Sequence, residues 1–189
     1  MENIINRVKN ILVSPKTEWT AIEAENAPHT KIFTSYVVLL ALIPAVAAFI
    51  GYGLIGYVGL HFGVRQAIIQ YVVMLGGTYL TAFIIDALAT NFGAVKDFNR
   101  AFSLVAYSYT PMFVGGVFYL LLPLAWLASL AGLYGLYLLY TGLQPMMKAP
   151  EDKQTTYFIV SLIVTIVVSV VLSSVLTAIL MPSGIFFRL

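Results

Sequence analysis

Five long runs of apolar residues, separated by short polar joints, dominate this chain of 189 residues. Each run reaches the ~20 residues that an α-helix needs to cross the hydrocarbon core of a bilayer. The pattern therefore predicts an all-α, polytopic membrane protein, with a surface segment over residues 1–32 and a five-span membrane domain over residues 33–189. The predicted spans are residues 33–57, 66–90, 101–122, 125–143 and 157–181.

Composition supports a membrane protein and excludes several other classes. Hydrophobic residues make up 60% of the chain and charged residues 10%, against about 25% charged residues in soluble domains. The chain has no cysteine, which excludes disulfides, thiolate catalysis and cysteine metal ligands. Its net charge of +2 comes without a dense basic patch, so nucleic acid is not an expected partner.

The distribution of basic residues predicts the orientation of the spans. Eight of the ten lysines and arginines precede the first span or lie in the joints after the second and fourth spans, and only Arg65 and Arg188 lie on the other side. By the positive-inside rule, the N-terminus is expected in the cytoplasm and, after five crossings, the C-terminus outside. We therefore expect a multi-pass protein of the cell (inner) membrane. The eight residues are Arg7, Lys9, Lys16, Lys31, Lys96, Arg100, Lys148 and Lys153.

The joint between the third and fourth spans is the least marked, because residues 113–143 are almost continuously apolar and only Pro123 suggests a turn. A single helix over residues 101–143 would be about 65 Å long at 1.5 Å per residue, twice the ~30 Å hydrocarbon core. A hairpin is therefore expected near Pro123. Without it, the C-terminal half would have the opposite orientation.

Two short amphipathic helices are predicted ahead of the first span. Apolar residues recur at helical spacing over residues 2–13, with Arg7 on the opposite, polar face. Ser14 and Pro15 then mark the N-cap and the first position of a second helix. Both helices suit the cytoplasmic headgroup region, and the alternative is a platform that docks a partner protein. The predicted interfacial anchors are Ile4, Ile11 and Trp19.

Asp86 is the one acidic residue within a predicted span. It lies about one turn from the cytoplasmic end of the second span, where it can reach the interface or pair with Lys96 or Arg100. The alternative is an ion or proton site, because an unpaired ionisable group in hydrocarbon is costly and is often functional.

A break in the third span is expected at Pro111. Proline cannot donate the helical hydrogen bond that would satisfy the carbonyl of Tyr107, so the helix should kink there. Ser108, Thr110 or a neighbouring helix can satisfy the freed carbonyl. One interpretation is a kinked helix packed by tyrosines. The alternative is a substrate-binding break, with Asp86, Tyr107 and Pro111 as a polar site between the second and third spans.

The fifth span carries a small hydroxyl residue at every fourth position. Such residues let helix backbones approach closely and form hydrogen bonds across the contact, so this ridge should face protein and favour a crossing angle near about −40°. The ridge serves either intramolecular packing or a homodimer contact. Its members are Ser161, Thr165, Ser169, Ser173 and Thr177.

Four loose motifs are spread over nearly the whole chain. They are Pro15, Trp19, Ile22 and Glu25; Asn91-Phe92-Gly93 leading to Phe98-Asn99-Arg100; residues 106–111; and residues 137–142. Together they resemble the bacterial branch of the Yip1 family of integral membrane proteins. The resemblance implies a five-span domain with a cytoplasmic N-terminus and an external C-terminus. Eukaryotic members are linked to Rab GTPases and vesicle traffic, but this chain lacks their long cytoplasmic N-terminal region and its acidic tyrosine-glycine-proline motif.

The residues give little support for an enzyme. His29 and His61 fall on opposite sides of the predicted membrane and cannot share a metal, and no glycine-rich loop has phosphate-binding spacing. We expect no catalytic residue, cofactor or metal, and a non-enzymatic protein that organises the membrane or partner proteins. The expected partners are membrane lipids, a membrane or cytoplasmic protein, or a second copy of the chain. The alternative function is a small transporter or channel that uses the site at Asp86.

Overall fold

A computed structural model of the chain describes residues 3–56 and 59–180, and only the backbone for residues 172 and 176–180. Every regular element in these ranges is helical, and five helical segments are long and apolar enough to cross a membrane. The predicted all-α fold with five spans is confirmed. Each segment begins three to six residues before its predicted first residue. The segments are His29–Ile55, Leu60–Phe92, Phe98–Leu120, Leu122–Met147 and Glu151–Val175.

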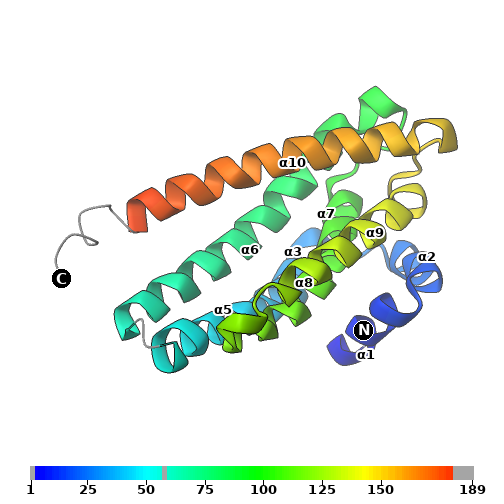
Figure 1. The fold of residues 1–189 in the computed structure, drawn as a ribbon. Coiled ribbons are helices and arrows are strands. Elements are labelled where there is room, and N and C mark those ends of the chain that lie inside the picture. Colours follow the sequence, from blue (N-terminus) through cyan, green and yellow to red (C-terminus); the bar gives the residue numbers. More distant parts are fainter. Residues whose placement is uncertain (1–2, 57–58, 181–189) are drawn as a thin grey trace.

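The third span lies at the centre of the bundle. In its most apolar stretch 72% of the residues are buried, whereas the corresponding share of the fifth span is 6%. Helix α7 (Phe98–Ser108) packs between α6 (Leu60–Ala89) and α9 (Leu127–Met147). Helix α10 (Glu151–Leu180) lies along one edge of the molecule and diverges from α6 towards its C-terminus (Figure 1).

The first span is continuous but alternates between α-helix and the wider π-helix. Such π-helical turns are rare and are often found near functional sites. The backbone of Gly116, in the third span, lies directly against Pro44, and a Cβ at Gly116 would overlap the proline ring. The elements of the first span are α3 (His29–Ile32), η1 (Phe33–Val37), α4 (Val38–Leu40), α5 (Leu42–Ala48) and η2 (Phe49–Ile55).

The break at Pro111 is confirmed. Helix α7 ends at Ser108, and α8 (Thr110–Gly115) has Pro111 in its first turn. The Thr110 hydroxyl donates to the Tyr107 carbonyl at 2.7 Å, so it satisfies the acceptor that the proline leaves without a helical partner. Because this hydroxyl gives its proton to Tyr107, it accepts from the Tyr36 phenol, 2.7 Å away. The break is thereby joined to the first span.

The joint near Pro123 is also confirmed. The third span ends in a 3₁₀-helix, η4 (Gly116–Leu120), and Pro123 lies within a second, η5 (Leu122–Leu124), before α9 begins. At the opposite end of the bundle, the second span ends in η3 (Thr90–Phe92), and the chain turns at Gly93, whose φ of 72° suits glycine.

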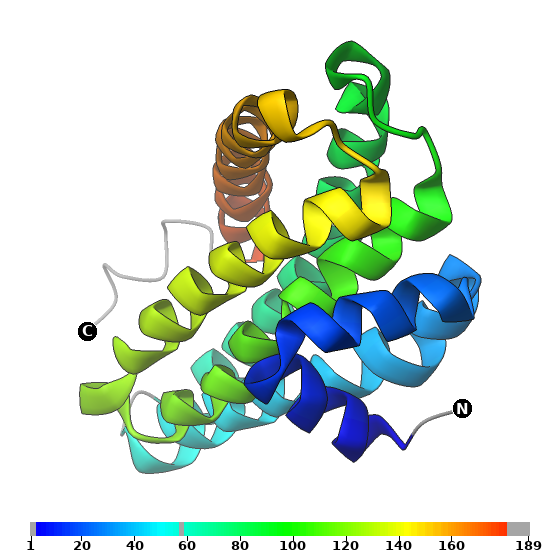
Figure 2. The same ribbon diagram turned by 90° about the vertical axis from the view of Figure 1, so that its right-hand side faces the viewer.

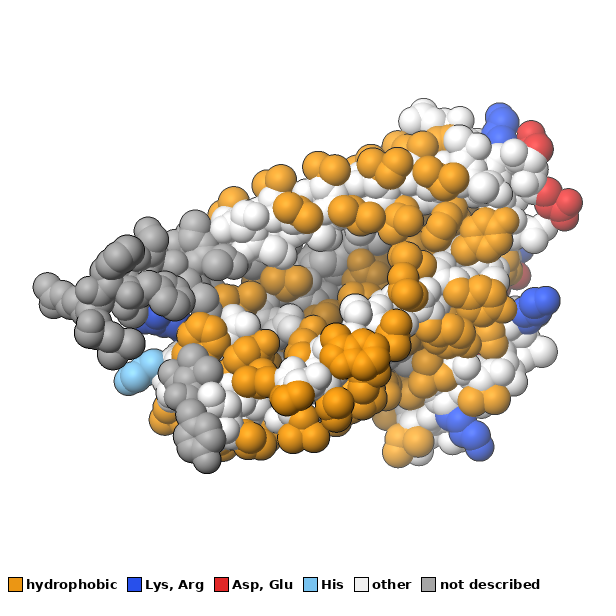
Figure 3. All heavy atoms as spheres, in the orientation of Figure 1, with side chains coloured by type: hydrophobic (Ala, Val, Ile, Leu, Met, Phe, Trp, Pro, Cys, Tyr) orange, Lys and Arg blue, Asp and Glu red, His pale blue; other side chains and the backbone are white. Residues whose placement is uncertain are grey.

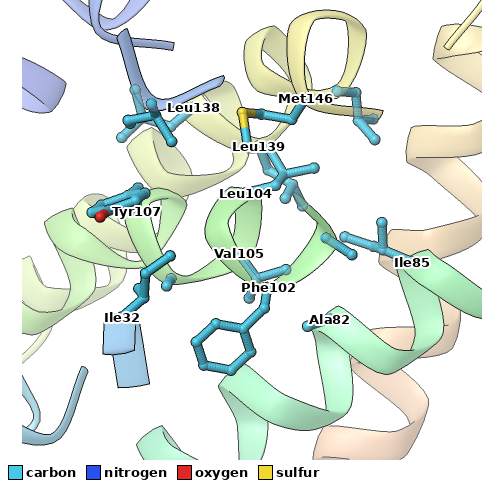
Figure 4. Packing of buried hydrophobic residues seen from close by; sticks show 14 of the residues in the cluster. Ile32, Ala82, Ile85, Phe102, Leu104, Val105, Tyr107, Leu138, Leu139 and Met146 are labelled. Atoms are coloured by element: carbon cyan, nitrogen blue, oxygen red, sulfur yellow. The ribbon is translucent and has the colours of Figure 1, made fainter. Parts of the chain in front are cut away.

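The hydrophobic core is centred on α7. Its side chains Phe102, Leu104 and Val105 have no solvent exposure and contact residues of α6 and α9 (Figure 4). The same cluster includes residues of the N-terminal helices, so these helices are part of the folded core. The N-terminal members are Ile11, Trp19 and Ile22.

Two helices, α1 (Ile4–Val13) and α2 (Pro15–Glu25), which we call the platform, pack against the bundle. Their predicted boundary at Ser14 is confirmed. The Tyr134 phenol of α9 donates to the Leu12 carbonyl at 2.7 Å. Since Tyr134 lies about 20 Å along α9 from its C-terminal end, α1 lies beside the spans and not across their ends, as Figure 2 also shows.

Helix α2 docks on α9 through a tryptophan placed against a glycine. A Cβ added at Gly142 would lie 2.7 Å from Cε2 of the Trp19 indole and 2.5 Å from Cδ1 of Leu104. Such distances are closer than van der Waals contact allows. The absence of a side chain at Gly142 therefore lets the indole lie on the backbone of α9.

Replacing Gly142 with alanine should push Trp19 away and destabilise the protein by about 1–3 kcal/mol, the usual cost of overpacking. Gly132→Ala on the same helix is the control, because nothing lies within 4 Å of a Cβ there. That substitution should stabilise α9 by up to about 1 kcal/mol through helix propensity. Thermal unfolding in detergent measures both, and shifts of the same sign and size would contradict this account.

Candidate functional site

A buried arginine links the platform to the centre of the bundle. Arg7 of α1 is 4% exposed and forms ion pairs with Glu18 and Glu25 of α2. Its guanidinium carbon lies 5.5 Å from the centroid of the Tyr107 ring of α7, within the range of a cation–π contact. One charged group therefore joins α1, α2 and α7.

The surroundings of Arg7 keep it charged. Burial by itself lowers the pKa of the guanidinium, but Tyr107, Glu25 and Glu18 together outweigh this effect, and the net pKa is raised above its usual range. A buried ion pair contributes little net stability, yet removing one partner leaves an uncompensated charge inside the protein. The cluster therefore fixes how the platform docks more than it adds to stability.

A second, more exposed cluster holds the end of α2. Glu23 forms ion pairs with Lys148, which ends α9, and with Arg100 of α7, whose Nη1 lies 3.5 Å from the Glu23 carboxylate. Arg100 also donates to the carbonyl of Met146 at 3.3 Å. Lys148 in particular lowers the pKa of Glu23, and the opposing effect of desolvation is smaller. Platform, third span and fourth span therefore meet at this point.

A cavity of about 230 Å³ lies between α1 and the start of the first span. Its lining is mixed. Ile4, Ala27 and Ile32 provide apolar surface, and the remaining lining residues are polar or aromatic. Those are Arg7, Glu25, Lys31, Ser35, Tyr36 and Tyr107.

The predicted interfacial anchors lie in the protein core or against the cavity beside α1. Ile11 and Trp19 are 0% and 1% exposed and lie in the protein core, while Ile4 lines the cavity. The headgroup-anchor interpretation of Ile11 and Trp19 was wrong, because both side chains are buried in the hydrophobic core of the protein. The prediction that Arg7 lies on an exposed polar face was also wrong. The outward apolar residues of α1 are Ile5 and Val13.

The structure does not bring together the predicted polar site of Asp86, Tyr107 and Pro111. Tyr107 faces Tyr36 at a ring distance of 4.8 Å and also faces the buried arginine, and Pro111 is buried at the helix break. Asp86 lies on the part of α6 that contacts α10, close enough to interact electrostatically with Tyr157. Figure 4 shows Tyr107 on one side of α7 and Ile85, the residue before Asp86, on the other.

The predicted pairing of Asp86 is not formed either. Arg100 pairs with Glu23 and Asp97. Within the described residues, Asp86 Oδ1 is buried without a hydrogen-bond partner, and no ion pair joins Asp86 to Lys96. Next to Asp86 in the sequence, the Ile85 carbonyl accepts a hydrogen bond of 2.5 Å from the Tyr157 phenol of α10.

The hydroxyl ridge of the fifth span begins in protein and continues towards the surface. Ser161 is 2% exposed, and neither its hydroxyl nor that of Thr165 has a hydrogen-bond partner among the described residues. Ser169 and Ser173 are half-buried, and the side chain of Thr177 lies outside the described residues. The crossing angle and the homodimer alternative remain predictions.

The sequence patterns did not indicate which residues hold the platform, namely Glu18, Glu23 and their cationic partners. Glu18 and Glu25 are seven residues apart on α2 and share a helical face with Ile22, which is buried. Two acids flanking a buried isoleucine are a signal that a cation faces the same surface.

Replacing Arg7 with methionine should release the platform, because the long apolar side chain keeps the packing but leaves Glu18 buried without this cation. We expect a loss of about 3–5 kcal/mol in the free energy of unfolding. Lys9→Met, on the exposed side of the same helix, should change it by less than about 0.5 kcal/mol. Thermal unfolding and limited proteolysis of α1 and α2 report the difference. Equal losses in the two variants would contradict the assigned role.

The second cluster predicts a pH dependence. The pKa of Glu23 is lower in the folded state than in the unfolded state, so its contribution is complete above about pH 4.3 and is lost as pH falls through the folded-state pKa. At pH 7 the free energy of unfolding of wild type should exceed that of Glu23→Gln by about 0.3–1 kcal/mol. The difference should vanish in acid. Unfolding of both proteins across this range tests it, and a difference that grew as pH fell would refute the sign.

Two sequence comparisons relate this chain to known proteins. The family model of the Yip1 domain matches residues 9–174. Inner membrane protein YohC of Escherichia coli strain K12 is 28% identical over 134 residues, which are 66% of this chain and 68% of YohC. YohC of Escherichia coli O6:H1, strain CFT073, gives the same figures. No solved structure matches the chain. The family match extends from α1 to α10 and covers most of the sequence, so this multi-pass membrane protein belongs to the Yip1 domain family.

Proposed function

We propose that the protein is a non-enzymatic organiser of the inner membrane, which presents its N-terminal platform to a membrane or cytoplasmic partner protein. The observation that carries this proposal is the pair of ion clusters at Arg7 and Glu23, which lock α1 and α2 to the third and fourth spans. A surface held in one geometry loses little conformational entropy when it binds, which favours recognition of a partner.

We further propose that the platform faces the cytoplasm and that the C-terminus is external. The support is the charge distribution. Most basic residues gather at the bundle end near the platform, where Figure 3 also shows acidic side chains, while apolar side chains cover the spans between the ends. The positive-inside rule assigns such an end to the cytoplasm. The similarity to an inner membrane protein supports the choice of membrane.

The outer face of α2 is the surface offered to a partner. Its side chains at Lys16, Thr17 and Thr20 are exposed, while the opposite face carries the buried Trp19 and Ile22. The face is short and polar, which suits a soluble segment or a charged loop of another membrane protein. On α1, Lys9 is exposed between Ile5 and Val13 at four-residue spacing, an arrangement typical of a helix edge that touches lipid headgroups.

The transporter alternative has less support. It requires Asp86, Tyr107 and Pro111 around one cavity between the second and third spans. Tyr107 instead lines the cavity beside α1, and Asp86 lies against the fifth span.

A photoreactive residue at position 20 should capture a partner protein in membranes, whereas one at position 5 should capture lipid. Mass spectrometry of the captured material measures both. Arg7→Met should abolish protein capture from position 20 because the platform is released, and Lys9→Met should leave it intact, with equal amounts of each variant in the membrane. Lipid alone from position 20 would overturn the platform role.

A further inference from the structure

The cavity beside α1 has the composition of a site for an amphiphilic molecule. One part of its wall is apolar, formed by Ile4, Ala27 and Ile32, and the charged residues Glu25 and Lys31 lie at exposed positions. It lies at the start of the first span, where a bilayer changes from hydrocarbon to headgroups. A molecule that enters here therefore meets apolar and charged surface together.

The cavity is lined by charges of both signs, the cations Arg7 and Lys31 and the anion Glu25. Arg7 is already paired with Glu18 and Glu25. Lys31 has no ion pair within the described residues, and the Glu25 side chain is 42% exposed. The cavity therefore offers a cation and an anion in one lining, which a ligand with two opposite charges can complement.

The third polar group of the site is the Ser35 hydroxyl, whose role as hydrogen-bond donor is already fixed. The Ser35 hydroxyl donates to the Lys31 carbonyl at 2.6 Å, so its proton is engaged and its oxygen is left to accept a hydrogen bond. The Glu25 carboxylate accepts from Arg7 through Oε1, and its second oxygen is a further acceptor. The site thus combines two acceptors with one ammonium donor, Lys31.

We propose that this cavity binds the headgroup of a phospholipid that joins a phosphate to a primary ammonium, as in phosphatidylethanolamine. The Lys31 ammonium pairs with the phosphate. Glu25 and the Ser35 oxygen accept hydrogen bonds from the headgroup ammonium. The acyl chains run from the apolar wall along the first span, where Leu39 is 50% exposed.

Charge and size separate this lipid from its competitors. In phosphatidylglycerol an uncharged glycerol stands in place of the ammonium, so Glu25 loses the charge-assisted hydrogen bond. A quaternary ammonium, as in phosphatidylcholine, has no N–H group to donate to Glu25 or Ser35. The volume of about 230 Å³ is below the ~300–1,000 Å³ of usual small-molecule sites, which suits a headgroup and not a whole lipid. The site does not depend on the proposed partner protein.

The test is native mass spectrometry of the purified full-length protein in detergent, with equal amounts of phosphatidylethanolamine, phosphatidylcholine and phosphatidylglycerol that carry the same acyl chains. Wild type should retain phosphatidylethanolamine about tenfold over phosphatidylcholine, the size expected of one charge-assisted hydrogen bond. Lys31→Gln should reduce binding of phosphatidylethanolamine and of phosphatidylcholine. Glu25→Gln should remove the preference while leaving the remaining binding, because the amide oxygen can still accept from Arg7 and Glu18 keeps its ion pair with Arg7.

Glu151→Gln and Lys153→Gln are the matched controls, because they remove the same charges from exposed positions at the start of α10 and should behave as wild type. Lys31→Gln should also unfold at the wild-type temperature, since Lys31 has no ion pair in the described part of the chain. Equal retention of the three lipids by wild type, or unchanged binding in Lys31→Gln, would overturn the proposal. If water-soluble phosphoethanolamine bound as tightly as the lipid, the proposal that the ligand is a lipid of the bilayer would be overturned.

Discussion

The burial of a single charge, the Arg7 guanidinium, constrains the arrangement of the N-terminal half. A guanidinium leaves water only where other groups replace its hydration, and here Glu18, Glu25 and the Tyr107 ring do so from two different helices. Helices α1 and α2 must therefore fold on each other and onto α7 at the same time. Ile11 enters the core as a consequence, because it lies one turn after Arg7 on the same face of α1.

The spans and the helix break are predictable from sequence because each depends on a local property of the chain. A span needs a run of apolar residues of sufficient length, and the break needs only the missing N–H of Pro111. Even the group that satisfies the freed carbonyl, Thr110, is near in sequence. The role of Arg7 is not local, since its partners lie 11 and 18 residues later. Helical periodicity therefore placed Arg7 on an exposed polar face.

Trp19 illustrates the same limit. A tryptophan near the start of a membrane domain is typical of a headgroup anchor, and its own helix gives no other indication. What buries it is Gly142, far away in the chain, whose missing side chain leaves the backbone of α9 open to the indole. Composition shows that glycine is present in the fourth span, but only the tertiary structure shows which residue lies against it.

Helix α10 shows how polar groups act when they lack such partners. Its first turns are fixed, since Tyr157 donates to the Ile85 carbonyl and stacks on Phe92 with ring centroids 5.1 Å apart. Further on, the buried hydroxyls of Ser161 and Thr165 have no partner in the described residues, and such a group costs about 1–3 kcal/mol. Burying the aliphatic side chains of α10 offsets little of this, because lipid solvates them as well as protein does. The ion pairs of Arg7 and Glu23 thus attach the platform to the bundle, whereas the hydroxyls of Ser161 and Thr165 give α10 no such attachment in the described residues.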